Sequence, residues 1–158
     1  MRFRDLLAEY PESREALFAY ACALDYAGHE SDAASAYERA FAAGLDGDDL
    51  RRELLQYGST LRNLERVDEA VAALEKADEM FPGHDSVKVF KALALTSAGR
   101  SREAVAGLID LALDRIDSDD LQRYRWAAQL RRGPGHMTRR TGRPGWSGRR
   151  VEVTTRGE

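Results

Sequence analysis

The side chains that most often bind metals or attack substrates are few in this 158-residue chain, and they are scattered. The three histidines, His29, His84 and His136, fall in turn-like or glycine-rich sequence, and none has a second histidine four residues away. Zinc sites on a helix use such a pair on one face, and structural zinc sites need four ligands in all. The sequence therefore predicts no metal site.

Cys22 is the only cysteine, so the chain cannot form an internal disulfide. His29 follows it seven residues later, which is about two helical turns, and the two could lie on one side of a helix. A catalytic cysteine needs an adjacent base, but the same spacing is found for small residues of a core or groove. We favour a core or groove position for Cys22.

Two pairs of carboxylates, at 48–49 and 119–120, stand where helices are expected to begin. Helix capping and the helix dipole explain acidic residues at such positions without catalysis. The chain also lacks the phosphate-binding loop, the dinucleotide-binding glycine motif and the G-x-S-x-G nucleophile motif. We therefore expect a protein that is not an enzyme and that carries no cofactor.

The bulk composition is that of a soluble domain, with 43% hydrophobic and 32% charged residues. No apolar run approaches the roughly 18 residues that a membrane span needs, so we expect no membrane association. The N-terminus begins Met-Arg-Phe-Arg-Asp and runs straight into an amphipathic pattern, unlike a secretory signal. The expected location is the cytoplasm.

Charge and composition divide the chain near residue 132. Residues 133–158 carry six arginines and two glutamates, a net charge of +4, whereas residues 1–132 carry 18 basic and 25 acidic residues, a net charge of −7. The last segment also holds six glycines and two prolines and shows no helical periodicity. We predict a helical domain over 1–132 and a disordered, basic Gly/Arg-rich tail over 133–158.

The helical domain is organised around the stretch 54–82, which has the pattern of two amphipathic helices joined by a polar turn at 63–68. The first helix has an apolar face with one small residue on it, and the second has a small–large–small pattern. The residues that carry these patterns are Leu54, Tyr57, Gly58 and Leu61, then Ala70, Leu74 and Ala77, with Pro82 at the end. The small residues predict that the two helices approach closely.

The small–large–small pattern occurs at Ala33-x3-Tyr37-x2-Ala40, 37 residues earlier, and in part from Ala104, 34 residues later, where Leu111 stands in place of the second small residue. The sequence thus predicts three helix hairpins in a row. Gly107 lies inside the last of these helices, where it costs about 1 kcal/mol relative to Ala or permits a close helix crossing. The expected N-cap residues are Ser13, Ser31, Asp48 or Asp49, Asp85, Ser101, and Asp117 or Ser118.

Two more segments flank the hairpins. Residues 2–10 have one apolar helical face and stop at Pro11, which fits either a short leader helix over the first hairpin or a frayed terminus. Residues 121–132 have the pattern of a last helix. Such a helix covers the exposed edge that a helical array would otherwise leave at its end.

The order and spacing of these residues, over about 13–113, resemble the tetratricopeptide repeat, a helix–turn–helix unit of 34 residues, in a small domain of the bacterial type. The resemblance implies an all-α fold: a right-handed α–α superhelix of about three hairpins plus capping helices. It also implies a non-catalytic protein–protein interaction module, an adaptor or scaffold, whose partner is a protein or peptide of unknown identity.

In that family the first helices of successive hairpins line a concave groove, which accepts an extended peptide or a partner helix. The resemblance places in this groove Phe18, Cys22, Asp25 and Tyr26, then Leu55, Ser59, Arg62 and Asn63, then Val89, Thr96 and Ser97. Phe18, Tyr26 and Leu55 would be apolar anchors, and Arg62 and Asn63 would orient the ligand.

One branch of the family grips the terminal carboxylate of chaperone peptides with cationic and amide side chains. The equivalent positions here hold Phe18, Cys22, Gln56, Ser86 and Phe90, which supply no cation, so chaperone-tail binding is not expected.

Two other functions stay open. Self-association through the exposed edges of the array, to form a homo-oligomer, would make the protein structural. Nucleic-acid binding by the tail would use Arg139, Arg140, Arg143, Trp146 and the arginines after them. We rank it lower, because the acidic body repels a polyanion.

Overall fold

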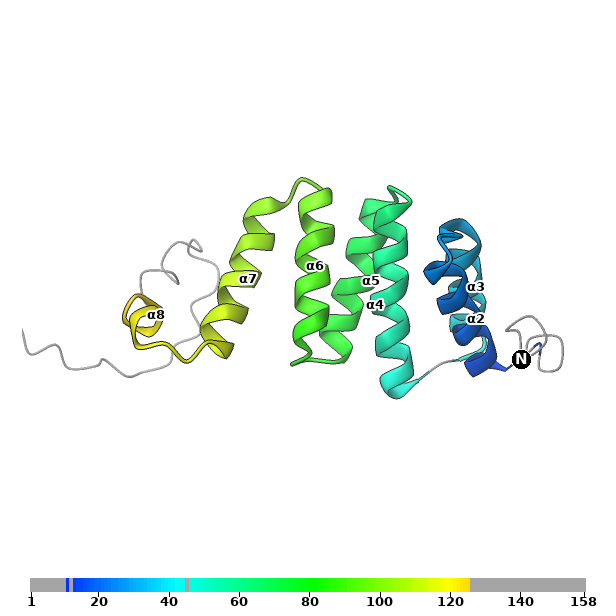
Figure 1. Cartoon of the computed structure of the whole chain (residues 1–158), viewed down its shortest axis with the longest axis horizontal. Coiled ribbons are helices and arrows are strands. Elements are labelled where there is room, and N and C mark those ends of the chain that lie inside the picture. The colour runs from blue at the N-terminus through cyan, green and yellow to red at the C-terminus, as the bar shows by residue number, and fades with distance from the viewer. Residues whose placement is uncertain (1–10, 12, 45, 126–158) are drawn as a thin grey trace, which may run out of the picture.

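The computed structural model describes residue 11, residues 13–44 and residues 46–125; the tail at 133–158 and the leader segment at 2–10 lie outside this part. Within it every regular element is an α-helix (Figure 1). The helices are α2 (Arg14–Tyr26), α3 (Glu30–Ala42), α4 (Gly47–Asn63), α5 (Val67–Met80), α6 (Asp85–Ser97), α7 (Ser101–Arg115) and α8 (Asp119–Arg123).

Consecutive helices pack in pairs, α2 with α3, α4 with α5, and α6 with α7, and the three pairs lie in a row along the long axis of the molecule (Figure 1). The all-α fold of three helix hairpins is therefore confirmed. None of the described helices is long and apolar enough to cross a membrane.

The turn inside each hairpin places one residue in the left-handed backbone region just after the first helix. Gly28 and Gly99 fill this position in the first and third hairpins, with φ of 79° and 75°. In the second hairpin Glu65 fills it, with φ of 61°. A residue with a side chain is strained there, whereas glycine is not. The turn geometry is therefore common to all three hairpins, and of these three turns only the second strains the backbone of a residue that has a side chain.

Close packing between α4 and α5 depends on Gly58, as the sequence predicts. A Cβ atom at Gly58 would lie 2.6 Å from Cγ of Leu74, much closer than carbon atoms approach. Gly107 in α7 is different, because no atom lies within 4 Å of the place where its Cβ would be. Gly107 therefore makes no close helix crossing within the described part of the chain, and it weakens α7.

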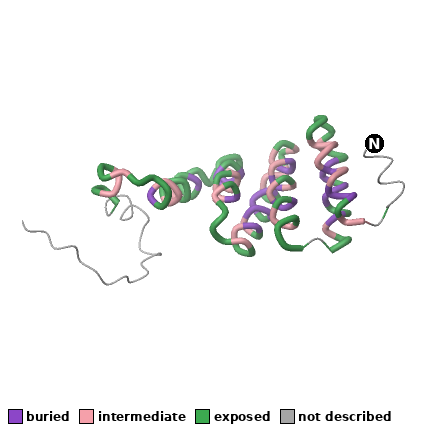
Figure 2. Tube along the Cα trace, turned by 60° about the horizontal axis from the view of Figure 1, so that its bottom comes forward, coloured by how far each residue is buried: buried purple, intermediate pink, exposed green. Residues whose placement is uncertain are grey.

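The buried side chains form one cluster in the first hairpin and two that join the second hairpin to the third (Figure 2). Tyr37 of α3 is the largest fully buried side chain of the first cluster. In the others, Leu61 and Leu74 share a cluster with Leu95 of α6, and Leu54 packs with Val87. The apolar core is thus continuous from α4 to α7.

Two of the expected N-caps are confirmed: the hydroxyl of Ser13 accepts from the amide of Ala16 at 3.2 Å, and that of Ser118 accepts from the amide of Leu121 at 3.4 Å. The other four are wrong. Helices α3, α4, α6 and α7 begin earlier than expected, so that Ser31, Asp48, Asp49, Asp85 and Ser101 lie in first turns, and the N-cap residues are His29, Asp46, His84 and Arg100.

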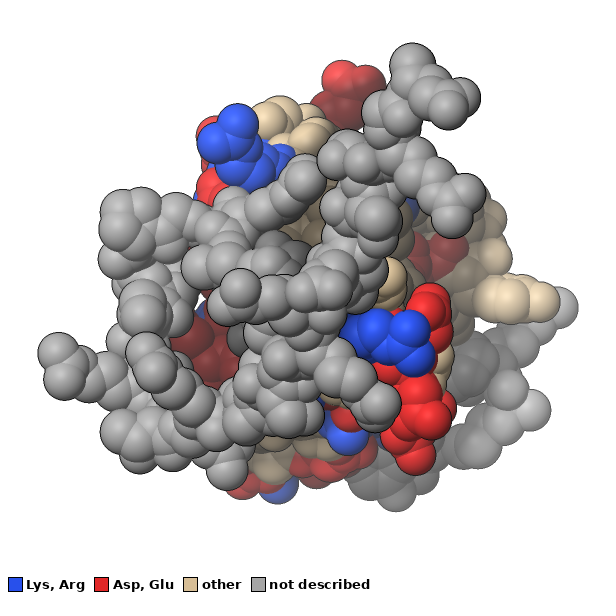
Figure 3. Space-filling view, turned by 90° about the vertical axis from the view of Figure 1, so that its left-hand side faces the viewer, with Lys and Arg blue, Asp and Glu red and all other residues tan. Residues whose placement is uncertain are grey.

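Ion pairs replace hydroxyl caps at the starts of α5 and α7. Arg66 holds Glu69 with N–O distances of 2.6 and 2.7 Å, and Arg100 holds Glu103 at 2.7 and 2.9 Å. Each arginine also reaches back to the preceding hairpin, Arg66 to Glu38 at 3.5 Å and Arg100 to Glu75 at 3.3 Å. Acidic and basic side chains also adjoin on the face of the molecule seen in Figure 3.

The helix expected over 121–132 begins earlier and is interrupted: α8 ends at Arg123, with Tyr124 as its C-cap, and residues 126–132 lie outside the described part. Gln122 ties α8 to the preceding helix, because its amide donates to the carbonyls of Leu113 and Ile116 at 3.0 and 3.3 Å.

Candidate functional site

The candidate site is an open groove of about 700 Å³ that runs along one face of α2 and meets the start of α4. Six of its lining residues come from α2, at spacings of three and four residues that follow one side of a helix. The groove is lined by Glu15, Phe18, Ala19, Cys22, Ala23 and Tyr26 of α2 and by Asp49 and Arg52 of α4.

The floor of the groove is Phe18, which is only 9% exposed because its ring packs against Tyr37, with 6.3 Å between the ring centroids. The guanidinium carbon of Arg52 lies 5.8 Å from the centroid of the same ring, within cation–π distance. Arg52 also pairs with Asp49 at 3.6 Å. The first and second hairpins are thus both needed to shape the groove.

Tyr26 stands at the other end of the groove and is 97% exposed. Between Tyr26 and Phe18 the wall is made of small residues, so a bulky side chain of a partner could approach the helix closely there. An exposed tyrosine beside such a surface offers both apolar area and a hydroxyl, which is why this residue type is frequent at binding surfaces.

Cys22 is half-buried in the groove wall, where its sulfur lies 3.7 Å from the hydroxyl of Tyr37. Burial raises the pKa of the Cys22 thiol. A thiol with a raised pKa is a poor nucleophile at neutral pH, because the thiolate is the reactive form. The structure therefore agrees with a groove position for Cys22 and gives no sign of activation.

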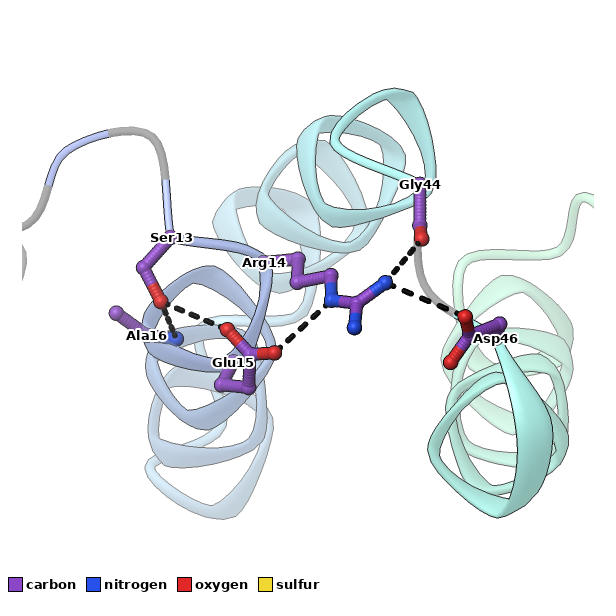
Figure 4. A network of polar contacts seen from close by, with 6 residues as sticks. All are labelled: Ser13, Arg14, Glu15, Ala16, Gly44 and Asp46. Carbon is purple, nitrogen blue, oxygen red and sulfur yellow. Dashed lines mark hydrogen bonds and ion pairs between the residues drawn. The ribbon is translucent and has the colours of Figure 1, made fainter.

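The end of the groove near Glu15 is held by a polar network (Figure 4). Glu15 accepts from Arg14 at 2.9 Å and from Ser13 at 3.0 Å, and the hydrogen bond from Arg14 lowers its pKa. Arg14 also donates to the carbonyl of Gly44 at 2.9 Å and pairs with Asp46 at 3.4 Å. This arginine joins the start of α2 to the segment between α3 and α4.

A family model described as tetratricopeptide repeat matches residues 14–130, which is more than half of the chain, and the three hairpins agree with it. This chain belongs to the tetratricopeptide repeat (TPR) family. A search of curated proteins found no match. The family's function is protein–protein interaction, which supports an interaction or scaffold role here.

In this TPR protein the groove residues expected on α2 lie together, with one exception. Phe18, Cys22 and Tyr26 line the groove, whereas Asp25 does not. Asp25 is half-buried, and burial raises the pKa of its carboxyl group, while hydrogen bonds with Thr60 and Tyr37 act in the opposite direction. Asp25 therefore faces the joint between α2, α3 and α4.

The residues expected on α4 are spread along that helix and do not line the groove. Leu55 is partly buried against the two clusters that join the second and third hairpins. Arg62 donates to Asn63 at 3.1 Å, and Asn63 donates to Glu30 of α3 at 2.8 Å. Ser59 is half-buried.

Those expected on α6 lie in the third hairpin, away from the groove along α2. Val89 is exposed, and the hydroxyls of Thr96 and Ser97 donate to backbone carbonyls one turn earlier, at 2.8 and 3.3 Å.

Five of the lining residues were not expected in the groove from the sequence: Glu15, Ala19, Ala23, Asp49 and Arg52. The three on α2 share the helical spacing of Phe18, Cys22 and Tyr26, so extending that stripe by one turn would have found them. Asp49 and Arg52 carry no such signal, because their position depends on how α4 packs against the first hairpin.

Proposed function

We propose that this TPR protein binds a peptide or helix of a partner protein in the groove between α2 and α4. The proposal is supported by one observation above all: a continuous stripe of α2 side chains, with a buried aromatic floor and an exposed Tyr26, lines a hollow of about 700 Å³. Grooves of this kind bind extended peptides or amphipathic helices through a few apolar anchors.

A second hollow, of about 270 Å³, lies over α5, α6 and α7 and is less suited to a partner. Most of its lining side chains are charged, and several already form ion pairs: Lys91 with Asp78, and Glu75 and Glu103 with Arg100. A ligand would have to replace these contacts, whereas the groove along α2 offers uncovered apolar surface.

Within the groove, Tyr26 is the proposed main anchor, and Phe18 with Arg52 forms the floor. A partner longer than α2 would continue across the first helices of the later hairpins. The further residues that such a partner would contact are Leu55, Ser59, Arg62 and Asn63 on α4, Val89, Thr96 and Ser97 on α6, and Asp25 beside the groove.

The test uses the full chain as bait in a selection from a displayed library of random peptides, followed by affinity measurements on the selected peptides. Tyr26→Ala is expected to weaken binding about tenfold or more, because truncating an aromatic anchor commonly costs 1–2 kcal/mol or more. Tyr124→Ala is the matched control, since Tyr124 is also exposed but lies at the opposite end of the array. Its affinity should equal that of the natural chain.

Two results would contradict the proposal: selection yields no binding peptide, or the peptides bind Tyr26→Ala and Arg52→Ala as tightly as the unaltered chain. Circular dichroism of both variants should show unchanged helix content, since neither side chain is part of a core cluster.

The outer face of α7 favours self-association as a second candidate function. Val105 and Leu108 are 55% and 40% exposed, while the residues 34 positions earlier, Val71 and Leu74, are buried because α6 covers them. A second copy of the chain could cover α7 in the same way. Sedimentation at several concentrations tests this, and Val105→Asp should abolish any concentration dependence.

A further inference from the structure

Glu53 of α4 is fully buried, with 0% of its surface exposed. Neither of its carboxylate oxygens has a hydrogen-bond partner among the residues that the structure describes. Burying a carboxylate without a partner is among the most costly arrangements in a protein, whereas burying the protonated acid costs much less. The packed arrangement therefore favours the protonated form of Glu53.

Among the described residues, no cation acts on the carboxyl group of Glu53, and burial is the cause that shifts its pKa. Cys22 of α2 and Tyr37 of α3 are the titratable groups that interact with Glu53, and Asp25 and Arg52 in turn lie near Cys22. Arg52 is engaged with Asp49 and with the ring of Phe18. Burial accordingly raises the pKa of Glu53 from its usual 4.5 to about 8.

The equivalent positions of the third hairpin show what Glu53 replaces. Val87 lies 34 residues after Glu53, and Ala94 lies 34 residues after the buried Thr60. Val87 and Ala94 are fully buried and belong to the clusters that join the second hairpin to the third. One joint between hairpins is therefore apolar at this face, and the other is polar.

Asp25 of α2 is hydrogen-bonded with the buried Thr60 of α4, and the other polar contacts between the first and second hairpins lie near the surface. Arg14 meets Asp46, Asn63 meets Glu30, and Tyr57 and Arg66 meet Glu38, all with exposed partners. Exposed pairs of this kind contribute little free energy. The joint thus depends on apolar packing around a group that favours packing only while it is protonated.

We propose that Glu53 is a pH-dependent switch at the joint between the first two hairpins, which opens the groove between α2 and α4 when Glu53 loses its proton to solvent. An ionised Glu53 needs water, and water reaches it when α2 and α3 move away from α4. Because the groove is lined by residues of α2 and by Arg52 of α4, the same movement separates its two sides. The effect on binding rests on the function proposed above; the opening itself does not.

Hydrogen exchange of the full chain at about pH 6 and pH 9, corrected for intrinsic exchange rates, tests the opening. Protection of amides in α2 and α3 should fall on the order of tenfold to a hundredfold more than protection in α6 and α7, as the pKa difference between packed and open states requires. Glu53→Gln keeps the shape without the charge, and its protection should fall equally in all three hairpins. Glu53→Val, which copies Val87, should behave likewise if Glu53→Gln folds poorly.

An equal loss of protection in the unaltered chain and in both variants would overturn the proposal, and so would a loss spread evenly over the three hairpins. Peptides selected at pH 6 give a separate readout: their affinity should fall at pH 9 for the natural chain and not for Glu53→Gln. If the first hairpin opens but no peptide binds at either pH, the groove function fails and the switch stands.

Discussion

The two joints of this array, between the first and second hairpins and between the second and third, occupy equivalent places but are built differently. At the second joint, apolar side chains of α4, α5 and α6 share clusters that run without a break. At the first joint, Glu53 and Thr60 of α4 are buried where Val87 and Ala94 stand in the other. Repeats that fold alike can thus differ greatly in how firmly they are attached.

The difference also coincides with the candidate site. The groove is walled by α2 and α4, so it crosses the weaker joint. Segments that move on binding come from the less stable parts of a protein, because their opening costs least. The joint between the second and third hairpins then stays packed, and the first hairpin is the part that can adjust to a partner.

The largest effect on stability is expected when a buried carboxyl group is introduced at the joint between the second and third hairpins. Val87→Glu should reduce the free energy of unfolding by about 3–5 kcal/mol at neutral pH, because it buries a carboxylate with no partner. Urea unfolding followed by circular dichroism measures this. Val89→Glu is the control, since Val89 is exposed on the same helix, and a change above about 0.5 kcal/mol there would point to a general effect of charge on α6.

The next largest effect is expected in the pH dependence of stability, which tests the role of Glu53 at the joint between the first two hairpins. The pKa of Glu53 is higher in the folded chain, about 8, than the usual 4.5, so between these values the folded chain holds a proton that the unfolded chain has lost. Stability should therefore fall as pH rises, by about 3 kcal/mol between pH 5 and pH 8. Glu53→Gln should be nearly flat over this range, and a curve as steep as that of the unaltered chain would assign the effect to other groups.

Two glycines in helices give the next largest effects, with opposite signs. Gly58→Ala should destabilise the protein by about 1–3 kcal/mol, because the new Cβ overlaps Leu74. Gly107→Ala should stabilise it by about 1 kcal/mol, because its Cβ meets open space. Thermal unfolding of both variants checks the pair. Equal shifts would mean that helix propensity alone, and not packing, decides.

The smallest expected effect is at Glu65. Glu65→Gly should stabilise the second hairpin by about 0.5–1 kcal/mol, because it relieves a left-handed backbone that Gly28 and Gly99 adopt without strain. Gly99→Ala is the reverse change, and it should destabilise by a similar amount. If Glu65→Gly loses stability, a contact of the Glu65 side chain outweighs the strain.

The fold could be predicted because its signal is local and repeated. Ala70, Leu74 and Ala77 set a helix face, Gly58 marks a close approach, and copies at 34 and 37 residues show that the unit recurs. The caps were harder to predict, because the suitable residues Ser31 and Ser101 stand two positions and one position after the actual N-caps. The ion pair from Arg100 to Glu103 closes the first turn instead.

The site was only partly predictable for a different reason. The stripe of Phe18, Cys22 and Tyr26 follows from helical spacing, but Arg52 joins it through packing between hairpins. The sequence does not distinguish Glu53 from other glutamates, because a glutamate in a helix is ordinary. Aligning Glu53 with Val87 at the 34-residue offset shows a charged residue at a position that is apolar in the third hairpin. The structure is needed to show that the side chain is buried without a hydrogen-bond partner.

The arginines before α5 and α7 give the array a direction. Each hairpin after the first carries an arginine that reaches toward the N-terminal side, and the hairpin before it carries the glutamate that receives it, as Arg66 with Glu38 and Arg100 with Glu75 show. A duplicated second hairpin inserted between the second and third would bring both halves of this connector. Gene duplication that lengthens the array by whole hairpins would therefore keep this ion pair at each new joint.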